Sequence, residues 1–393
     1  MLPSRLYLSD PLLKGVAGHH LGYNLALADA ARRAGVPAEL VTHRDFEPDL
    51  ANGCPTHRIF QTDHRFEPPK CMARNQRLLA WLATWSAFRF GRNLKHFPAV
   101  RSSEAVFAQM LAPRHFLEWL KWFHAQVNPP VLFLHLGYSP EKFSDPRIVN
   151  SFHALSKRRR ERIVLLTDSE KLVPSFEQIF GDKVHHLPHV ISYDIPAPEA
   201  RSRRKPLEIF APGNARREKG FVEVCRAAEA ISASGMADDF HFVIQCHDPD
   251  PVCAVILKDG VAKESCIEWI PRPLPDQEYT ERLARADALL LPYHLDQYAR
   301  RTSGIFCEAR VAGKPVVTTR GSWAGDRVLR EGGGWLVEER DVAALTGALM
   351  DLPSEFDKQA ADAVALAGNA RKEFHRDSFM AGMLDLFSRA VSA

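Results

Sequence analysis

The chain has 393 residues, more than one hydrophobic core usually serves, so two domains of about 150 to 200 residues each are expected. Hydrophobic residues make up 46% and charged residues 25% of it, which excludes a disordered, fibrous or coiled-coil protein. The formal net charge is +3, too small to indicate nucleic-acid binding without a basic face of suitable shape.

The N-terminal residues MLPSRLYLSDPLLKG lack the basic and apolar segments of a secretory signal. No uninterrupted apolar run in the sequence approaches the ~18 residues that span a bilayer. The seven cysteines are scattered and show no CxxC spacing, which suits a reducing compartment. We therefore expect a cytoplasmic protein.

The first elements predict a β-loop-α-β unit, the opening of a doubly wound sheet. RLYLS predicts a strand, residues 21–35 predict a helix, and PAELVTH predicts a second strand. The loop before the helix contains glycines, which permit close backbone approach, and a helix N-terminus attracts a phosphate or sugar oxygen. Gly18, His19 and His20 are therefore candidate substrate contacts, although the histidines could equally pack or cap the helix.

The rest of the first half contains two continuous apolar runs, VLFLHL (131–136) and RIVLLTD (162–168), as buried parallel strands require. Residues 66–128 are predicted to be mainly helical, and their segment 78–97 interleaves aromatic with basic residues. With the basic residues 157–160, this segment could dock on an anionic membrane surface near a lipid-linked acceptor. We favour the other interpretation, a buried helix with a solvated basic end.

A proline- and arginine-rich segment, PAPEARSRRKP at residues 196–206, is the expected interdomain linker. Beyond it the β/α rhythm restarts, and the last residues predict helices that pack back on the first domain. The expected division is a first domain of residues 1–195, a second domain of residues 207–355 and C-terminal helices of residues 356–393.

The strongest functional signal lies in residues 288–319, where a buried strand leads through a polar loop to a helix that opens at Thr302, Ser303 and Gly304. Backbone N–H groups at such a helix start lie beside the positive end of the helix dipole, a ready site for a phosphate. Glu308, about one turn further on, aims a carboxylate at the same place and can accept two ribose hydroxyls. An ordinary capped helix is the alternative.

A second signal lies in LEIFAPGNARREKGF, residues 207–221, where a strand ends in a loop with Arg216, Arg217 and Lys219 before a helix. Fixed cations in such a loop stabilise negative charge on a ligand without a metal. A solvated turn is the alternative for this loop alone. The two signals together are more specific.

These segments resemble the retaining GT-B glycosyltransferases, which transfer a sugar from a nucleotide sugar. Gly213, Glu218, Lys219 and Gly220 match the family loop G-R-x-x-x-E-K-G, and Glu308 with the following AGKPVV matches the second half of its Glu-x7-Glu element. The resemblance implies an α/β fold of two Rossmann-like domains that face each other across a cleft. It covers residues 205–350 most firmly.

The resemblance also implies roles for single residues. His135, at the end of VLFLHL, would contact the donor sugar unless it is a core histidine, and Trp269 with Arg272 would lie near the nucleotide base, although tryptophan is more often core. The expected catalytic residues are Lys219, Glu308 and His135. Donor binding is expected at Gly213, Asn214, Arg216, Arg217, Arg272, Arg300, Thr302, Ser303, Gly304 and Ile305, and the acceptor side of the cleft at Gly18, His19 and His20.

Two positions depart from the family pattern. Arg300 stands where the first glutamate of the Glu-x7-Glu element belongs, and Asn214 stands where the loop arginine belongs. Arg300 could contact phosphate or an acidic sugar, and Arg216 or Arg217 could supply the missing loop charge. The departures keep open a non-catalytic binding protein with this fold. A nucleotide-sugar epimerase or phosphorylase is a third possibility within the same fold.

Other motifs are weaker. Asp248-Pro249-Asp250 spells the DxD of metal-dependent glycosyltransferases, but its surroundings favour a turn. The sequence has no zinc-type His-x3-His pair with a glutamate, no GxSxG elbow, no P-loop and no GxGxxG. We therefore expect a glycosyltransferase that needs no metal or bound cofactor, takes a nucleotide sugar as co-substrate and a saccharide-type hydroxyl as acceptor, and has no nucleic-acid partner.

Overall fold

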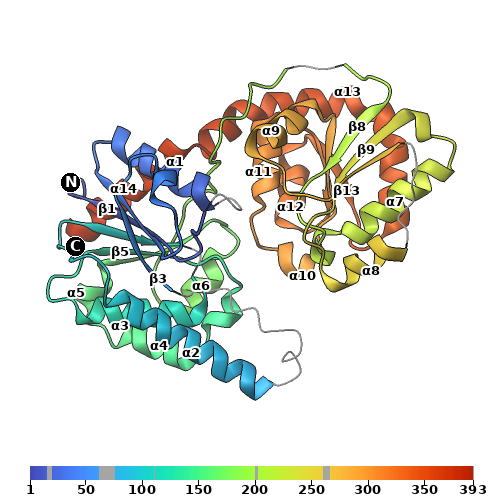
Figure 1. Cartoon of the computed structure of the whole chain (residues 1–393). Helices are drawn as coiled ribbons and strands as arrows, with labels where there is room; N and C mark the ends of the chain where they lie inside the picture. The colour runs from blue at the N-terminus through green and yellow to red at the C-terminus, as the bar shows by residue number, and fades with distance from the viewer. Residues whose placement is uncertain (16–19, 62–75, 110, 200–201, 260–265, 393) are drawn as a thin grey trace. The chain divides into compact units, whose positions relative to one another are not determined.

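The computed structural model describes the whole chain except residues 16–19, 62–75, 110, 200–201, 260–265 and 393. The chain forms two compact units (Figure 1), Met1–Ser192 with His375–Ala393 and Tyr193–Phe374. Each unit has its own parallel sheet and its own hydrophobic core. Among the described residues, no helix is both long enough and apolar enough to cross a membrane.

The sheet of the first unit has seven parallel strands in the order β3-β2-β1-β4-β5-β6-β7, the order of a doubly wound, Rossmann-like sheet. Such sheets bind ligands at the carboxyl ends of their strands, where the strand order reverses, which here is beside β1. The strands are β1 (Leu6–Asp10), β2 (Ala38–His43), β3 (Thr56–Phe60), β4 (Ala105–Ala108), β5 (Val131–His135), β6 (Ile163–Thr167) and β7 (Val184–His186).

Alternate strand residues of this sheet point to two separate cores, because side chains of a strand alternate between its faces. Leu6 and Leu8 of β1 pack in one core, whereas Tyr7 packs in the other. The covering helices are α1 (His20–Arg33), α2 (Gln76–Leu94), α3 (Pro113–Ala125), α4 (Pro146–His153), α5 (Lys157–Arg160), α6 (Val173–Phe180) and α14 (Arg376–Ser392), with short 3-10 helices at Pro48–Ala51 and Pro140–Phe143.

Two features of this unit differ from the sequence prediction. The four-residue strand β4 lies within the region predicted to be mainly helical, because AVFA is too short to show a period. The predicted buried helix of residues 78–97 is α2, which buries Phe90 and Leu94 but exposes Trp81, Trp85 and Phe88. A helix that lies on a sheet can bury only one of its faces.

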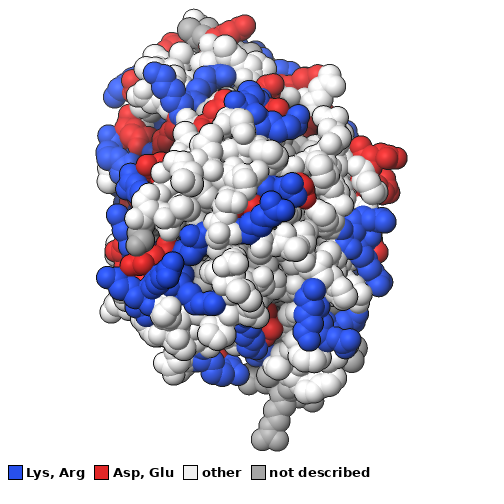
Figure 2. Space-filling view, turned by 90° about the vertical axis from the view of Figure 1, so that its left-hand side faces the viewer, with Lys and Arg blue, Asp and Glu red and all other residues white. Residues whose placement is uncertain are grey.

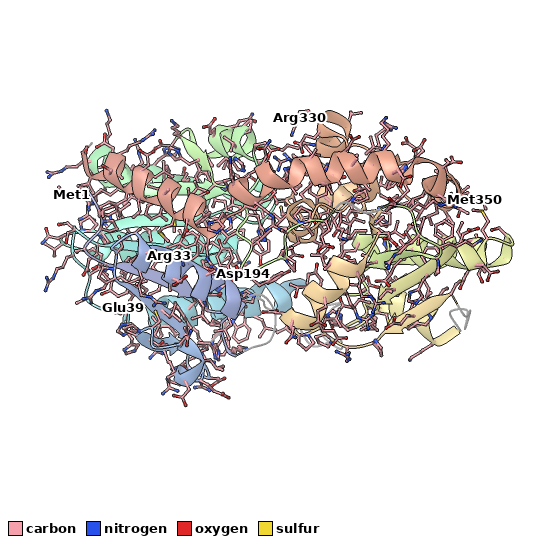
Figure 3. All side chains as sticks on the ribbon, turned by 90° about the horizontal axis from the view of Figure 1, so that it is seen from above. Met1, Arg33, Glu39, Asp194, Arg330 and Met350 are labelled. Atoms are coloured by element: carbon pink, nitrogen blue, oxygen red, sulfur yellow. The ribbon has the colours of Figure 1, made fainter. Side chains whose placement is uncertain are left out.

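The C-terminal helix α14 belongs to the first unit although 182 residues of the other unit, Tyr193–Phe374, precede it in the chain. Phe379 and Phe387 of α14 are buried in the core that also contains Leu27 of α1. Arg33 of α1 forms an ion pair with Asp377 at the start of α14, and Figure 3 marks Arg33 on α1. The last helix therefore completes the core on this face of the sheet.

The second unit repeats the same sheet order with six parallel strands, β10-β9-β8-β11-β12-β13. Its strands are β8 (Leu207–Ala211), β9 (Phe240–Gln245), β10 (Ile267–Ile270), β11 (Ala288–Leu291), β12 (Val316–Thr319) and β13 (Gly334–Val337). Its helices are α7 (Phe221–Ala233), α8 (Pro251–Asp259), α9 (Asp276–Arg285), α10 (Leu295–Tyr298), α11 (Gly304–Val311), α12 (Trp323–Glu331) and α13 (Val342–Glu373), with 3-10 helices at Arg217–Lys219 and Ala237–Asp239.

Helix α13 has 32 residues and continues past residue 355, where the sequence analysis placed the end of the second domain. Its buried residues Leu345, Leu349 and Phe356 join the core of the second unit. Pro353 lies inside the helix. The second unit therefore ends at Phe374, and only α14 returns to the first unit.

Candidate functional site

Gly213 follows β8 and opens the loop that leads into α7. Its φ of +109° is a conformation that L side chains rarely adopt. Its N–H donates to Gln245 Oε1 at 2.7 Å, and Gln245 Nε2 donates to the carbonyl of Arg272 at 3.1 Å. Because Gln245 is the last residue of β9, this buried amide joins the loops after three neighbouring strands at the carboxyl edge of the sheet.

Lys219 ends a short 3-10 helix and lies against Gly213. Gly220 follows it with a φ of +72°, in contact with the carbonyl of Pro292, so no side chain fits there. A Cβ on Gly213 would lie 2.8 Å from Lys219 Nζ and 3.2 Å from Ile305 Cδ1. The absence of that Cβ therefore keeps Lys219 next to the first turn of α11.

Burial lowers the pKa of the Lys219 amine below its usual value. The charges of Arg216 and Arg301 lower this pKa further, whereas Glu218 and Glu308 raise it. A desolvated ammonium beside two other cations is stabilised by an added negative charge. The electrostatics around Lys219 therefore suit a phosphate-bearing ligand.

Glu308 lies in the second turn of α11 and accepts hydrogen bonds from the hydroxyls of Tyr193 and Tyr279. Burial raises the pKa of its carboxyl, while the two tyrosines and Lys219 lower it. The tyrosine rings pack edge to face, with centroids 5.9 Å apart. This carboxylate already accepts hydroxyl hydrogen bonds, which is the chemistry that binding a ribose needs.

Helix α11 begins at Gly304, immediately after its cap residue Ser303. Ser303 Oγ accepts a hydrogen bond from the N–H of Phe306 at 3.2 Å and donates one to the hydroxyl of Tyr293 at 3.2 Å. The side chain of Ser303 is therefore a helix cap, and the amides of Gly304 and Ile305 have no acceptor within the helix. The aligned peptide dipoles make this end of α11 positive.

The basic loop after Gly213 is held by the loop that follows β9. Asn214 Nδ2 donates to Asp248 Oδ2 at 2.8 Å, and Arg216 forms an ion pair with the same oxygen. Arg217 exposes its side chain, and its N–H donates to Asp250. Asp250 also accepts two N–H groups at the start of α8 at 2.9 Å each. The two aspartates of the DxD sequence therefore support the basic loop.

The residues after β10 are placed at the rim of this edge. Arg272 forms an ion pair with Glu278 of α9 at 2.8 Å, and its side chain is 55% exposed. Trp269 packs against the core of the second unit. A core position was the alternative to a contact with the nucleotide base. Arg300 and Thr302 lie partly buried in the segment between α10 and α11.

In the first unit, a network of hydrogen-bonded side chains lies at the carboxyl ends of the strands. Asp10, the last residue of β1, accepts from Asn24 Nδ2 at 2.9 Å and lies 2.8 Å from Nδ1 of His20, with both contacts on Oδ2. Gln109, which follows β4, donates to Asn24 Oδ1 at 2.7 Å. His20 is thereby held at the start of α1 by a buried carboxylate.

The predicted loop residues Gly18 and His19 lie outside the described residues. His135 is described and buried at the end of β5. Burial lowers the pKa of its imidazole, and the charge of Asp168 raises it. Burial likewise lowers the pKa of His189, which is affected by the same Asp168 and by His135. One buried imidazole, one half-buried imidazole and a carboxylate thus gather near the ends of β5 and β6.

Comparison with known families identifies the second unit. Residues 206–355 match the family described as Glycosyl transferases group 1. The second unit therefore contains a domain of this glycosyltransferase family. The matched residues include Gly213, Lys219, Ser303 and Glu308, which lie together around the first turns of α11. No curated protein matches the sequence.

Solved structures show that the chain has the GT-B fold of two Rossmann-like α/β domains. The sucrose-phosphate synthase of Thermosynechococcus elongatus is 13% identical with a TM-score of 0.66, and the alignment covers 99% of both chains. HepE of Anabaena in complex with UDP and glucose is 14% identical with a TM-score of 0.67, over 98% of this chain and 99% of that one. A glycosyltransferase of Rickettsia africae is 11% identical with a TM-score of 0.65, over 99% of both chains.

The structure brings together part of the predicted donor set. Lys219 and Glu308 lie close enough for each charge to affect the pKa of the other. Ile305 packs beside them, whereas Arg217 is exposed and Arg272 pairs with Glu278. The roles assigned to all of these residues stay predictions.

Sequence reasoning missed Arg301, Tyr193, Tyr279 and Asp10. Arg300 was selected because it occupies the position of the family's glutamate, and its neighbour Arg301 was not considered. The sequence of two adjacent arginines does not indicate which of them affects the pKa of Lys219. The tyrosines lie far from Glu308 in sequence. Asp10 alone had a usable signal, because a carboxylate directly after a buried strand lies at the ligand-binding edge of a parallel sheet.

Proposed function

We propose that this protein moves a sugar from a nucleoside diphosphate sugar to a hydroxyl of a saccharide or lipid-linked saccharide. The observation that carries the proposal is the convergence of Lys219 Nζ, the N-terminus of α11 and the carboxylate of Glu308 around Gly213. A cation, outward amides and a hydroxyl-accepting carboxylate are the groups that a diphosphate and its ribose require.

The chemistry follows from these positions. The bond between the anomeric carbon and the diphosphate oxygen breaks, and Lys219 with the amides of Gly304 and Ile305 stabilises the negative charge that the leaving group gains. Glu308 accepts hydrogen bonds from hydroxyls of the ribose. These groups hold the donor without a metal, and we propose that none is needed.

We further propose that the sugar keeps its anomeric configuration. The acceptor hydroxyl then attacks from the face that the diphosphate leaves, and its proton passes to a leaving phosphate oxygen. Support for this outcome comes from the resemblance of the two donor segments to retaining enzymes. On the first unit, we assign His20, held by Asp10, and His135 to the acceptor hydroxyl and the sugar.

The test is turnover with UDP-, GDP- and ADP-glucose and a panel of saccharide acceptors, with and without EDTA. The released nucleoside diphosphate is the quantity measured. The anomeric proton of the product, observed by NMR, reports the configuration. We expect release with one donor, unchanged by EDTA, and a product with the configuration of the donor. Release that stops with EDTA would contradict metal independence, and an inverted product would contradict retention.

A further inference from the structure

The outward face of α2 carries large aromatic side chains that the proposed function does not use. Trp81, Trp85 and Phe88 are 59%, 44% and 60% exposed. The described buried side chains of the helix lie on its opposite face and are Ser86, Ala87, Phe90, Asn93 and Leu94. Single exposed apolar residues are ordinary, but three large aromatic residues along one face mark an interaction surface.

The spacing of these residues shows that they form one line. Residues that are four and three positions apart share a face of a helix, and Trp81, Trp85 and Phe88 follow this spacing. Arg92 and Lys95, both exposed, continue it to the C-terminal end of α2. We call these five residues the α2 stripe, with an aromatic half and a basic half.

The charge around the α2 stripe is mainly positive. Residues 76–103 contain five Lys or Arg and no Asp or Glu. Arg89 lies over the ring of Trp85 at 4.7 Å, and Arg114 of α3 donates to Thr84 at 2.7 Å, so two further cations flank the aromatic half. On the part of the face in Figure 2 that corresponds to α2–α4 in Figure 1, blue side chains predominate over red ones.

One acidic side chain of the neighbouring helix approaches α2. Glu118 of α3 lies against Gly91, where a Cβ would collide with its carboxylate. Lys121 pairs with Glu118 at 2.6 Å, so this carboxylate is already partly neutralised. Gly91 is three positions from Phe88 and adjacent to Arg92, so the Glu118 carboxylate lies beside the stripe, where Lys121 offsets its charge. The basic half of the stripe therefore keeps its positive character.

We propose that the α2 stripe docks the first unit on an anionic lipid bilayer. Tryptophan and phenylalanine favour the boundary between headgroups and acyl chains, and flanking Arg and Lys are attracted to lipid phosphates. A second copy of the chain fits the stripe less well, since a symmetric contact would bring two acid-free basic segments together. The proposal goes beyond glycosyl transfer, because binding the donor does not require α2.

The experiment is co-sedimentation of the full chain with sucrose-loaded vesicles of phosphatidylcholine, alone or with phosphatidylglycerol. The wild type should sediment with the phosphatidylglycerol vesicles and much less with the neutral ones. The triple variant Trp81→Ser, Trp85→Ser, Phe88→Ser should lower the partition coefficient by about tenfold or more, since binding scales with buried apolar area. Arg92→Glu with Lys95→Glu should remove the preference for anionic vesicles.

The matched control is the triple variant Val252→Ser, Val255→Ser, Leu329→Ser, whose side chains in the second unit are 45%, 54% and 66% exposed. It should sediment like the wild type. The thermal shift that a nucleotide causes checks in every variant that the donor site is intact, so failure of membrane binding is separable from failure of the donor site.

Two results would overturn the proposal. One is a wild type that stays in solution with both kinds of vesicle, or an aromatic variant that sediments as well as the wild type. The other is a wild type that does not bind vesicles but is dimeric in light scattering and becomes monomeric in the aromatic variant, which would assign the stripe to contact between copies.

Discussion

Glu308 is buried and accepts hydrogen bonds from two tyrosine hydroxyls. Burial and these hydrogen bonds shift its pKa in opposite directions. Burial raises the pKa of the carboxyl above its ordinary 4.5, and the hydrogen bonds from Tyr193 and Tyr279 lower it. The net shift is upward, so the folded protein binds a proton more readily than the unfolded chain does. Ionised Glu308 therefore costs stability, and this cost appears as the pH rises from about 4.5 through the raised pKa of the folded state.

From this sign, Glu308→Gln is expected to raise the free energy of unfolding at pH 7, and the gain should shrink as the pH falls toward 4.5. Denaturant unfolding at a series of pH values measures it. The control is Glu338→Gln, at a side chain that is 65% exposed. A gain that is the same at every pH would contradict the assigned burial of the charge.

Removing one hydrogen-bond donor to Glu308 should weaken nucleotide binding while the carboxylate itself stays in place. Tyr279→Phe deletes a hydroxyl that bonds to Glu308. This hydroxyl fixes the orientation of the Glu308 carboxylate, so we expect its loss to raise the dissociation constant of the preferred nucleoside diphosphate. Titration calorimetry measures it. Tyr138→Phe, in the first unit, is the control and should leave the constant unchanged.

Gly213 offers a matched test of the space beside Lys219. Gly213→Ala forces a strained φ and places a methyl group 2.8 Å from Lys219 Nζ. Gly235→Ala also has a positive φ, +83°, but its Cβ would have nothing within 4 Å. Both should lose about 1–3 kcal/mol of unfolding free energy, but only Gly213→Ala should also weaken nucleotide binding. Equal binding by both variants would contradict the placement of Lys219.

The sequence predicted Lys219, Ser303 and Glu308 because each stands at a fixed offset from a strand end or a helix start. The partners of these residues could not be predicted in the same way. Asp248 holds Arg216 and Asn214 from a loop 32 to 34 residues further along the chain. Such contacts depend on which strands are neighbours in the sheet, and a single sequence does not give that order.

At the scale of elements, the N-terminus of α11 joins capping to ligand binding. Ser303 caps α11 and Ser322 caps α12, where its Oγ accepts from the N–H of Gly325 at 2.9 Å. The two serines are therefore alike in structure. They differ in that only α11 begins beside Lys219.

Ser303→Ala and Ser322→Ala should each lower the free energy of unfolding by about 1 kcal/mol, since both remove an N-cap. Only Ser303→Ala should also raise the dissociation constant of the nucleoside diphosphate, because the first turn of α11 frays. Denaturant unfolding and calorimetry on both variants provide the comparison. An equal effect of the two variants on nucleotide binding would argue against a ligand at α11.

Most elements were predictable because buried parallel strands are continuous apolar runs and helices show a 3.6-residue period. The exposed face of α2 was not, since aromatic residues on both sides of a helix give the pattern of a fully buried one. Short strands such as β4 also escaped, because four residues, Ala105–Ala108, show no period.

For the whole molecule, the connectivity of the two units has a measurable consequence. The second unit is continuous, Tyr193–Phe374, and includes its own core and all of the predicted donor-binding residues. The first unit is discontinuous, because α14 supplies Phe379, Met380, Met383 and Phe387 to its core. The linker and the β/α rhythm predicted two domains, but the point where α13 gives way to α14 has no compositional mark.

We therefore expect residues 193–374 to fold alone, with a cooperative thermal transition and retained nucleotide binding. Residues 1–192 alone should fold poorly, since truncating buried Phe or Met residues costs about 2–5 kcal/mol each. Joining residues 375–393 to residue 192 through a flexible linker should restore a cooperative transition. Circular dichroism during heating compares the three proteins. A stable fragment 1–192 would contradict the role given to α14.

The most direct test of the donor site is titration calorimetry of UDP, GDP and ADP on the wild type, Lys219→Ala and Glu308→Ala, with the exposed residues Lys358→Ala and Glu338→Ala as controls. We predict that one nucleotide binds the wild type, that each site variant weakens it about tenfold or more, and that the controls bind as the wild type does. Binding by no nucleotide, or equal binding by wild type and site variants, would contradict a diphosphate site between Lys219 and α11.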